Sequence, residues 1–528
     1  YGRGVDSDIP EWLLSRRELL PTDQMLTALH TPPDMASADH ARRSLVYAEL
    51  FFLQLSVALR SVLRKEAVRP AQRLPRTELE TLVTNLPFSL TDDQTKVLSE
   101  IVHDLEQDIP MARLLQGDVG SGKTVVALLS ALPVIEAGHQ VVLMAPTELL
   151  AKQHADTAAR LLQSAGSDVV VGFLSGSIST SMRKPLLEAI ATGTVDLVIG
   201  THAVFTESVR FRNLRYAIVD EQHRFGVLQR LALTQKARQP DLMLMTATPI
   251  PRTLALTVFG DMSVSTIRTM PAGRKTVETH LARQVNERKV HEFVGRELAA
   301  GRQAYFVYPV IDASGKLDLR DAEGMWTRLK DEVYPEYEVG LVHSRLKEDE
   351  KSATMDRFRD GDLGVLVATS VVEVGVDVPN ATCMVVEHAE RFGLSALHQL
   401  RGRVGRGEHQ SYCFLVYDDE LTDIAKERLK TIHTHTDGFQ IAEEDLRIRG
   451  PGDIAGTEQS GYLRFRAADL LRDMEMMNEA RADAFDILES DPTLDAPENQ
   501  SLRAALVAAR GQHRLTPLAY RDTYLPSE

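Results

Sequence analysis

The chain has 528 residues, which at about 150 residues per domain is enough for three or four domains. Its hydrophobic fraction of 43% and charged fraction of 26% are those of a soluble globular protein, and the nearest approach to an apolar membrane span, residues 45–63, contains Glu49, Gln54 and Arg60. The net charge of −15 gives no support to general binding of a phosphate backbone, although the sum does not reveal local basic stripes.

The two cysteines, Cys383 and Cys413, lie in apolar runs that are typical of buried strands. Core packing is therefore favoured over redox or metal chemistry for both thiols, and we expect a cytoplasmic protein. The sequence begins with Tyr1, and nothing like a signal peptide follows. We expect that it starts partway through a longer polypeptide.

Residues 1–85 carry apolar residues at helical spacing but no recognisable catalytic pattern. We expect helices over about 11–30 and 40–68, separated by breaking residues at 31–34. The apolar face of the second helix has to pack against another element, and a missing upstream domain is one candidate. A helical brace between domains is the role that this segment suggests.

Two side chains suited to a purine base, Phe88 and Gln94, follow this segment. An aromatic ring can stack on a base, and a glutamine amide both donates and accepts, which suits the edge of adenine. Phe88 would be a core residue in most sequences. Ser89, Thr91 and Asp92 are also plausible N-cap residues for a helix at about 93–102.

The stretch LLQGDVGSGKT at 114–124 fits the phosphate-loop pattern G-x-x-x-x-G-K-[ST]. A turn whose backbone N–H groups all point inward needs residues that tolerate positive φ, and glycine tolerates it best. Apolar runs before and after the loop supply the strand–loop–helix context that the motif requires. We expect Lys123 to reach the β- and γ-phosphates of ATP and Thr124 to place its hydroxyl on Mg²⁺. The expected nucleotide-binding residues of the loop are Gly117, Gly120, Ser121, Gly122, Lys123 and Thr124.

Short β-rich runs alternate with helical segments after the loop, which predicts a parallel sheet with functional groups at the carboxyl ends of its strands. The expected strands are 141–145, 169–174, 197–199, 217–219 and 242–245. Thr147 and Thr201 each follow a strand and open a helix. Contact with a sugar–phosphate backbone and ordinary helix capping explain either residue equally well.

An acidic motif, Asp220-Glu221-Gln222-His223, follows the apolar run YAIV. We expect Asp220 to hold Mg²⁺ and Glu221 to polarise the attacking water. Gln222 and His223 carry donors and acceptors suited to sensing the γ-phosphate. A surface acidic turn is the alternative, but the position at a strand end matches that of the phosphate loop.

The pattern resets near residues 271–274, and a second α/β run follows without a phosphate loop of its own. Its expected strands are 304–310, 339–342, 365–368, 383–387 and 413–417. The segment QLRGRVGRG at 399–407 places three arginines among three glycines. Guanidinium groups suit phosphate oxygens, and an arginine delivered across a cleft is worth about 10³–10⁵ in rate. Upstream, Gly375 and Asp377 lie at a strand end, where they could couple polymer contact to the nucleotide state.

Residues 418–528 read as mostly helical, apart from a glycine-rich segment at 445–461. Because four glycines and a proline are incompatible with a helix interior, we expect a shaped loop there.

In this order, GDVGSGKT, APTELLAKQH, GTHA, DEQHRFGV, MTATPIPRTLA, VATSVVEVGVDVPNAT, HQLRGRVGRG and DLRIRGPGDIAGTEQSG resemble the RecG family of ATP-dependent DNA helicases, within helicase superfamily two. The resemblance covers roughly residues 86–461 and implies two tandem RecA-like lobes. By this resemblance, the nucleotide-site residues include Phe88 and Gln94 for adenine, Lys123 and Thr124 of Walker A, Asp220 and Glu221 of Walker B, Gly375, Asp377 and Gln399, and Arg403 and Arg406 facing the γ-phosphate.

The glycine-rich segment resembles the family's TRG motif, which transmits lobe closure into movement along double-stranded DNA. The expected DNA-coupling residues are Arg447, Arg449 and Gln459 in this segment, together with Thr147 and Thr201 at the strand ends of lobe 1. Transcription-repair coupling translocases share the loop. The family also carries a wedge domain that splits forked DNA, and residues 1–85 do not read as its five-stranded barrel, so the wedge is either upstream or absent.

The resulting prediction is an α/β protein with two tandem RecA-like parallel-sheet lobes and helical flanks. Its expected parts are a helical segment at 1–85, lobe 1 at 86–270, lobe 2 at 271–417 and a helical region at 418–528. The expected activity is ATP-dependent movement on double-stranded and branched DNA, such as stalled forks and Holliday junctions. We expect a monomer with no membrane association, and single-stranded DNA-binding protein is a candidate partner. The alternatives are a transcription-repair coupling translocase, an RNA helicase, and a nucleotide-gated clamp that holds nucleic acid without moving.

Overall fold

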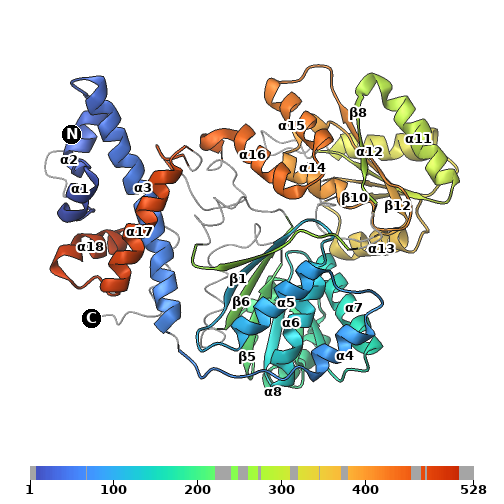
Figure 1. The fold of residues 1–528 in the computed structure, drawn as a ribbon. Helices are drawn as coiled ribbons and strands as arrows, with labels where there is room; N and C mark the ends of the chain where they lie inside the picture. Colours follow the sequence, from blue (N-terminus) through green and yellow to red (C-terminus); the bar gives the residue numbers. More distant parts are fainter. Residues whose placement is uncertain are drawn as a thin grey trace.

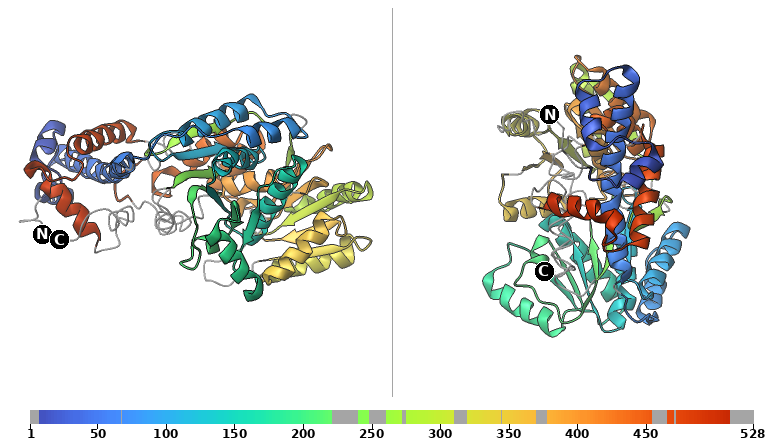
Figure 2. Two further views of the ribbon diagram at one scale, coloured as in Figure 1. Left: turned by 90° about the horizontal axis from the view of Figure 1, so that it is seen from below. Right: turned by 90° about the vertical axis from the view of Figure 1, so that its left-hand side faces the viewer.

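The computed structural model describes residues 7–66, 68–220, 240–247, 260–271, 275–309, 319–343, 345–369, 378–453, 465–469 and 472–510. These residues form two helix-covered parallel sheets and a separate helical bundle (Figure 1). Seen from two directions, the bundle lies to one side of both sheets (Figures 1 and 2). The predicted fold class, two tandem parallel-sheet lobes with helical flanks, is confirmed.

The described part of lobe 1 contains seven parallel strands in the spatial order β3-β4-β2-β5-β6-β1-β7. The strands are β1 (Ala112–Gly117), β2 (Gln140–Met144), β3 (Val171–Leu174), β4 (Leu197–Gly200), β5 (Leu214–Val219), β6 (Asp241–Thr246) and β7 (Ser263–Ile267). The helices are α4 (Thr77–Asn85), α5 (Asp92–Leu105), α6 (Lys123–Glu136), α7 (Glu148–Ser164), α8 (Thr180–Thr192) and the 3₁₀ turn η1 (His202–Phe205). One apolar core lies on each face of the sheet.

Six parallel strands make up the described part of lobe 2, in the order β10-β11-β9-β12-β13-β8. The strands are β8 (Glu278–Arg283), β9 (Gln303–Val307), β10 (Val339–Val342), β11 (Val365–Ala368), β12 (Ala381–Val386) and β13 (Tyr412–Tyr417). The helices are η3 (Gln284–Asn286), α11 (Glu287–Ala299), α12 (Leu319–Arg328), η4 (Leu329–Val333), α13 (Glu348–Arg359), η6 (Ala389–Arg391) and α14 (Leu394–Arg401). Cys383 and Cys413 are both buried in this lobe, in adjacent strands, as the sequence predicts.

Eleven strands predicted from the sequence are present in the described part of the chain, counting β1 before the phosphate loop, with ends that shift by a few residues. The two unpredicted strands, β7 and β8, lie at the edges of their sheets. Both carry exposed and polar side chains, because an edge strand needs apolar residues on fewer sides than a central one. Their sequences therefore lack the continuous apolar run that marks a buried parallel strand.

The helical bundle combines both ends of the chain. It consists of α1 (Glu11–Arg17), α2 (Thr22–His30), α3 (Met35–Glu66), α17 (Met474–Ser490), η7 (Pro497–Asn499) and α18 (Gln500–Arg510). α17 packs along α3, and the two share one apolar core with α1 and α18. The fully buried Asp483 of α17 accepts hydrogen bonds from Arg17 at 2.7 and 3.0 Å and from Tyr47 at 2.5 Å. The C-terminal helices thus bury the apolar face of α3 for which an upstream domain was one candidate.

By length and hydropathy, the span Met35–Val62 of α3 could cross a membrane, but 67% of its most apolar window is buried inside the protein. A core helix passes the same test, and the packing on α17 identifies α3 as such a helix. The bundle also touches lobe 1, because Arg60 lies 3.3 Å from Asp261 and Arg481 donates to the carbonyl of Gly260 at 2.8 Å.

Two further helices, α15 (Asp423–Thr434) and α16 (Gly438–Asp453), form a hairpin against lobe 2. The expectation of a loop from residue 445 is wrong for its first part, because α16 continues through Gly450, Pro451 and Gly452 to Asp453. Ile441 and Leu446 of this helix are buried, and tertiary packing of this kind overrides weak helix propensity. Residues 454–461 of the expected loop lie outside the described residues.

A candidate nucleotide site joined to the C-terminal hairpin

The phosphate loop connects β1 to α6 in the conformation that its glycines predict. Gly120 and Gly122 have φ of 77° and 86°, the left-handed region that favours glycine. A Cβ at Gly122 would lie 2.3 Å from Nε2 of Gln94, so a side chain there would also collide with its neighbour. The ammonium of Lys123 donates to the carbonyls of Gly117 at 2.7 Å and Asp118 at 2.9 Å. It therefore lies inside the loop, where phosphate would compete for it.

The loop has the chemistry that a nucleotide phosphate and Mg²⁺ need. The hydroxyl of Ser121 is buried without a hydrogen-bond partner, so it is available to a ligand. Lys123 and Thr124 are the first two residues of α6, where the unpaired N–H groups and the helix dipole favour an anion. These residues fit the phosphates and the cation that the motif implies.

Gln94 is a link between α5 and the phosphate loop. Its side chain accepts from the backbone N–H of Thr91 at 2.9 Å and donates to the carbonyl of Ser121 at 2.8 Å. Thr91 accepts in return from the Gln94 backbone, which completes a capping box, so the helix-start interpretation of this segment is also correct. Phe88 is 46% exposed and lines a surface cavity of about 740 Å³ between α4 and α5, which Gln94 does not line.

Asp220 ends β5 as a buried carboxylate. Its Oδ2 lies 2.7 Å from Nε2 of His154 on α7. His154 belongs to the motif APTELLAKQH but was given no role from the sequence. The structure assigns it the task of orienting the Asp220 carboxylate. Glu221, Gln222 and His223 lie outside the described residues.

The arginine-rich turn of lobe 2 lies directly against the phosphate loop of lobe 1. A Cβ at Gly402 would lie 2.7 Å from the Val119 side chain, so only glycine allows this approach. Arg403 is buried, and Nε of Arg406 donates to the carbonyl of Gly402 at 3.1 Å. Gln399, in the preceding α14, is buried as well. The two lobes thus meet where the expected ATP-facing arginines begin.

A chain of hydrogen bonds runs from the phosphate loop to the α15–α16 hairpin. Asp118 accepts from Nε2 of His398 at 2.5 Å and from the backbone N–H of Gly438, the first residue of α16, at 3.1 Å. Nδ1 of His398 lies 3.0 Å from the Arg401 guanidinium. Since that guanidinium can only donate, Nδ1 accepts and Nε2 carries the proton given to Asp118.

The same guanidinium closes the chain at the turn between α15 and α16. Arg401 donates to the carbonyls of Ile432, His435 and Thr436 at 2.7, 2.9 and 3.2 Å. These carbonyls end α15, so one buried side chain holds the turn that positions α16. A cavity of about 310 Å³ lies beside the chain, lined by residues of both lobes and of the turn, including Asp118, Arg268 and Phe439.

The electrostatics of Asp118 favour its charged form. Burial opposes ionisation, but the hydrogen bond from His398, with those from the N–H groups of Val119 and Gly438, outweighs it and holds the pKa of Asp118 below its ordinary value. The carboxylate is therefore charged at neutral pH, and the contact between the lobes is a charge-assisted one.

The expected DNA-coupling residues are only partly described. Thr147 caps α7 by accepting from the N–H of Leu150 at 3.4 Å, and Thr201 is buried at the start of η1. The exposed Arg447 pairs with Glu427 of α15 and with Glu444 at 2.8 Å, which ties the two hairpin helices together. The side chain of Arg449, and Gly375, Asp377 and Gln459 altogether, lie outside the described residues.

Sequence reasoning missed Asp118, His154, His398 and Gly438 as members of the site. The first three stand inside motifs that it recognised. A signal was available for His398, because a histidine three positions before clustered arginines and glycines suggests a charge partner in the cleft.

Three protein-family profiles match successive parts of the chain. A profile of DEAD/DEAH box helicases matches residues 91–257, and a profile of the helicase conserved C-terminal domain matches residues 290–408. A third profile, described as ATP-dependent DNA helicase RecG, domain 3, C-terminal, matches residues 435–513. The last match begins in the turn that Arg401 holds.

Individual relatives agree. The chain is 50% identical to ATP-dependent DNA helicase RecG of Treponema pallidum over 516 residues, covering 92% of this chain and 74% of that protein. The RecG helicase of Bacillus subtilis is 45% identical, with coverage of 96% and 74%. A solved structure of RecG bound to a three-way DNA junction superposes with a TM-score of 0.73 at 41% identity, and this chain covers 62% of its length. With identities of this size over most of both sequences, the chain belongs to the RecG family of ATP-dependent DNA helicases.

Proposed function

We propose that the protein hydrolyses ATP in the cleft between its lobes and uses the closing movement to translocate on double-stranded DNA, with branched DNA as its substrate. The observation that carries this proposal is the continuous hydrogen-bonded chain from Asp118 through His398 and Arg401 to the α15–α16 hairpin. The RecG relative bound to a three-way junction supports the choice of substrate. Stalled forks and Holliday junctions are the branched structures that we expect it to process.

In this mechanism the phosphate loop binds the triphosphate, with Lys123 exchanging its two loop carbonyls for phosphate oxygens. Thr124 and Asp220 would hold Mg²⁺, which when bound neutralises charge on the phosphates. Glu221 orients the attacking water, and Gln222 and His223 respond to the γ-phosphate. Arg403 and Arg406 reach the same phosphate from lobe 2, and Phe88 and Gln94 serve the adenine.

Asp118 would couple the phosphate loop to lobe 2 and to α16 through the groups that it contacts. Its backbone carbonyl accepts from Lys123, while its side chain holds His398 and Gly438. When Lys123 turns to phosphate, the loop carbonyls lose their donor and the carboxylate can move with them. His398, Arg401 and the start of α16 follow because each is bonded to the next. Arg449 near the end of α16, and Gln459 beyond it, transmit the motion to DNA, with Gly375, Asp377 and Gln399 linking lobe 2 to the nucleotide.

The contacts of the DNA are proposed at the carboxyl edge of lobe 1 and at the hairpin. Thr147 and Thr201 lie at that edge, and Arg447 and Arg449 lie on α16. The negative net charge restricts these contacts to local sites. Single-stranded DNA-binding protein is a proposed partner, the acting form is proposed to be a monomer, and the cytoplasm is its proposed location.

The division into parts at 85/86, 270/271 and 417/418 stays a prediction. Packing favours a refinement in which residues 418–453 accompany lobe 2, whereas residues 472–510 join residues 7–66 in the bundle. The bundle would then act as a brace on lobe 1 at Asp261.

Stimulation of ATP hydrolysis by different nucleic acids tests the proposed substrate. We expect branched duplex DNA to stimulate most, linear duplex DNA less, and RNA least. Stimulation by RNA without a response to DNA would contradict the proposal and favour an RNA helicase. Arg449→Ala and Gln459→Ala should keep DNA-stimulated hydrolysis while losing movement; if both activities fall together, the segment has a structural role only.

A further inference from the structure

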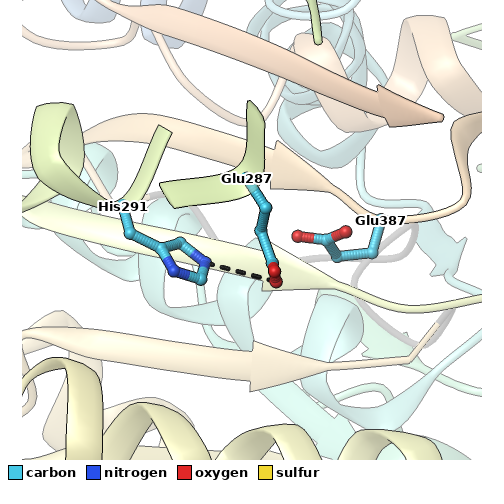
Figure 3. A group of neighbouring side chains, drawn as sticks. All are labelled: Glu287, His291 and Glu387. Carbon is cyan, nitrogen blue, oxygen red and sulfur yellow. Dashed lines mark ion pairs between the residues drawn. The ribbon is translucent and has the colours of Figure 1, made fainter. Parts of the chain in front are cut away.

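Three ionisable side chains meet at the carboxyl edge of the lobe 2 sheet (Figure 3). Glu287 is the first residue of α11, and His291 lies one turn later on the same helix. Glu387 directly follows β12, and its carboxylate points toward Glu287. The nitrogen of His291 and the carboxylate oxygens of both glutamates all lie within 4.8 Å of one another.

The three side chains are withdrawn from water. Glu387 is 3% exposed and His291 is 6% exposed, while Glu287 is partly buried. Two carboxylates this close and this dry repel each other unless a positive charge lies between them. Burial, and then the charge of Glu287, raise the pKa of Glu387 to about 8.

Two of the three side chains have a buried polar atom without a hydrogen-bond partner. These atoms are Oε1 of Glu387 and Nε2 of His291, and the latter lies 3.6 Å from Oε1 of Glu287. Tyr308 follows β9 and lies beside Glu387, because the backbone N–H of Glu387 donates to the carbonyl of the preceding Val307. The buried hydroxyl of Tyr308 also has no hydrogen-bond partner. Such buried polar groups are rare in proteins, and three at one point indicate a missing partner.

The surroundings hold the cluster in place. The His291 ring packs between Phe306 and Tyr334, with ring centroids 5.7 and 6.1 Å away.

One cation already faces the cluster from another element. The guanidinium of Arg328, at the end of α12, lies 3.2 Å from Glu287. A carboxylate oxygen has two lone pairs, so Glu287 can serve Arg328 and a metal together. Arg328 does not satisfy Glu387 or His291, whose polar atoms stay without a hydrogen bond.

We propose that Glu287, His291 and Glu387 form a divalent cation site, with Zn²⁺ as the best-fitting ion. Imidazole nitrogen with two carboxylates is a ligand set that Zn²⁺ accepts at about 2.0–2.2 Å, whereas Mg²⁺ prefers oxygen ligands alone. Ligand atoms around a tetrahedral ion lie about 3.3 Å apart, and rotation of the flexible glutamate side chains closes the difference from the observed spacing.

A cation bound at this site would cross-link two segments of lobe 2. It joins the start of α11 to the end of β12, and Glu387 begins the turn that leads through η6 into α14. α14 carries His398 and Arg401 of the coupling chain. The cation would therefore fix the base of the helix that touches the phosphate loop. This inference does not depend on the proposed function.

Metal binding to the full chain without nucleotide tests the proposal. The chelator-stripped protein is dialysed against limiting Zn²⁺ and its metal content is measured, and Co²⁺ replaces Zn²⁺ for visible absorption. We expect one equivalent of Zn²⁺ and a Co²⁺ spectrum of low coordination number. Glu387→Gln and His291→Ala should each weaken binding by about 100-fold.

Two matched variants guard against other sites. His280→Ala removes an exposed histidine 3.8 Å from Glu278 in the same lobe, and it should keep the full equivalent of Zn²⁺. Lys123→Ala disables the nucleotide site and should keep it too. Glu387→Gln is nearly isosteric, so it decides the matter if His291→Ala does not fold.

The proposal is overturned if the wild-type chain takes up no Zn²⁺ or Co²⁺. It is equally overturned if Glu387→Gln retains wild-type affinity, since the metal would then lie elsewhere. A loss of binding in His280→Ala comparable to that in Glu387→Gln would also count against it.

Discussion

Buried polar groups at the two edges of the lobe 1 sheet differ in their hydrogen-bond partners. At the amino edge, Asp241 is fully buried at the start of β6 and accepts from Arg69 at 2.8 Å through both oxygens and from the N–H of Met111 at 2.7 Å. Arg215 adds a second cation at 3.6 Å. At the carboxyl edge, the Ser121 hydroxyl has no partner, and Asp118 accepts from the N–H of Val119 in its own loop and from groups of lobe 2 and of α16.

This difference distinguishes buried polar groups that stabilise the fold from buried polar groups that belong to the nucleotide site. The partners of Asp241 all come from lobe 1 and the segment leading into it, so its bonds are made once on folding and do not change. The bonds of Asp118 to His398 and Gly438 join lobe 1 to lobe 2 and to α16, and in the proposed mechanism they change as the lobes move. The carboxyl edge of lobe 2 continues the pattern, since Glu387 and Tyr308 lack partners there.

The largest expected effect lies at the carboxyl edge. Lys123→Ala should lower ATP turnover by about 10³-fold or more, because the phosphates lose their charged partner. The free energy of unfolding should change little. Steady-state hydrolysis and chemical denaturation of the same samples measure both quantities, and near-normal turnover would refute the phosphate-loop assignment.

At the amino edge we expect a large change in the free energy of unfolding and a small change in ATP turnover. Asp241→Ala leaves Arg69 and Arg215 without their buried partner, so we expect the free energy of unfolding to fall by about 3 kcal/mol. Turnover per folded molecule should stay within two-fold at low temperature. Asp419→Ala, which removes an exposed pair with Arg283, serves as the control and should have little effect. A large loss of ATP turnover in folded Asp241→Ala would contradict a purely structural role for the amino edge.

A single methyl group tests the coupling chain. A Cβ at Gly438 would lie 2.7 Å from Nε2 of His398 and 3.0 Å from the Asp118 carboxylate. Gly438→Ala should therefore reduce DNA movement per ATP by about ten-fold, within the range of coupling between sites, while basal hydrolysis persists. Gly324→Ala is the matched control, because its Cβ meets nothing within 4 Å. Equal behaviour of the two variants would remove Gly438 from the coupling path.

The smallest expected effect concerns Thr147, for which the sequence allows two roles. Loss of the cap in Thr147→Ala should lower the free energy of unfolding by about 0.5–1 kcal/mol. We also expect DNA affinity to fall by two- to five-fold, because the hydroxyl can still donate to a phosphate while it accepts from Leu150. Unchanged DNA affinity would leave capping as its only role. Fluorescence anisotropy with labelled duplex DNA measures this.

The sequence predicts those parts of the fold whose determinants are local. Central strands such as β2 and β12 are continuous apolar runs because both faces are covered, whereas the edge strands β7 and β8 lack that signal. The helix through Pro451 could not be expected, because it depends on packing of α16 against lobe 2.

The candidate site divides in the same way. Glycines at positive φ and a lysine at a helix start are visible in a short motif, and the structure has both. The contact between Asp118 and His398 joins residues 280 positions apart, so no local pattern encodes it. The Glu287–His291–Glu387 cluster escapes detection for the same reason, since only the fold brings its two segments together.

Displacement of the third strand from a DNA triplex tests most directly whether this protein moves on duplex DNA. We predict that the wild-type chain displaces the strand only with hydrolysable ATP, and that Lys123→Ala does not displace it. DNA-stimulated hydrolysis without any displacement would contradict the translocase and favour a nucleotide-gated clamp.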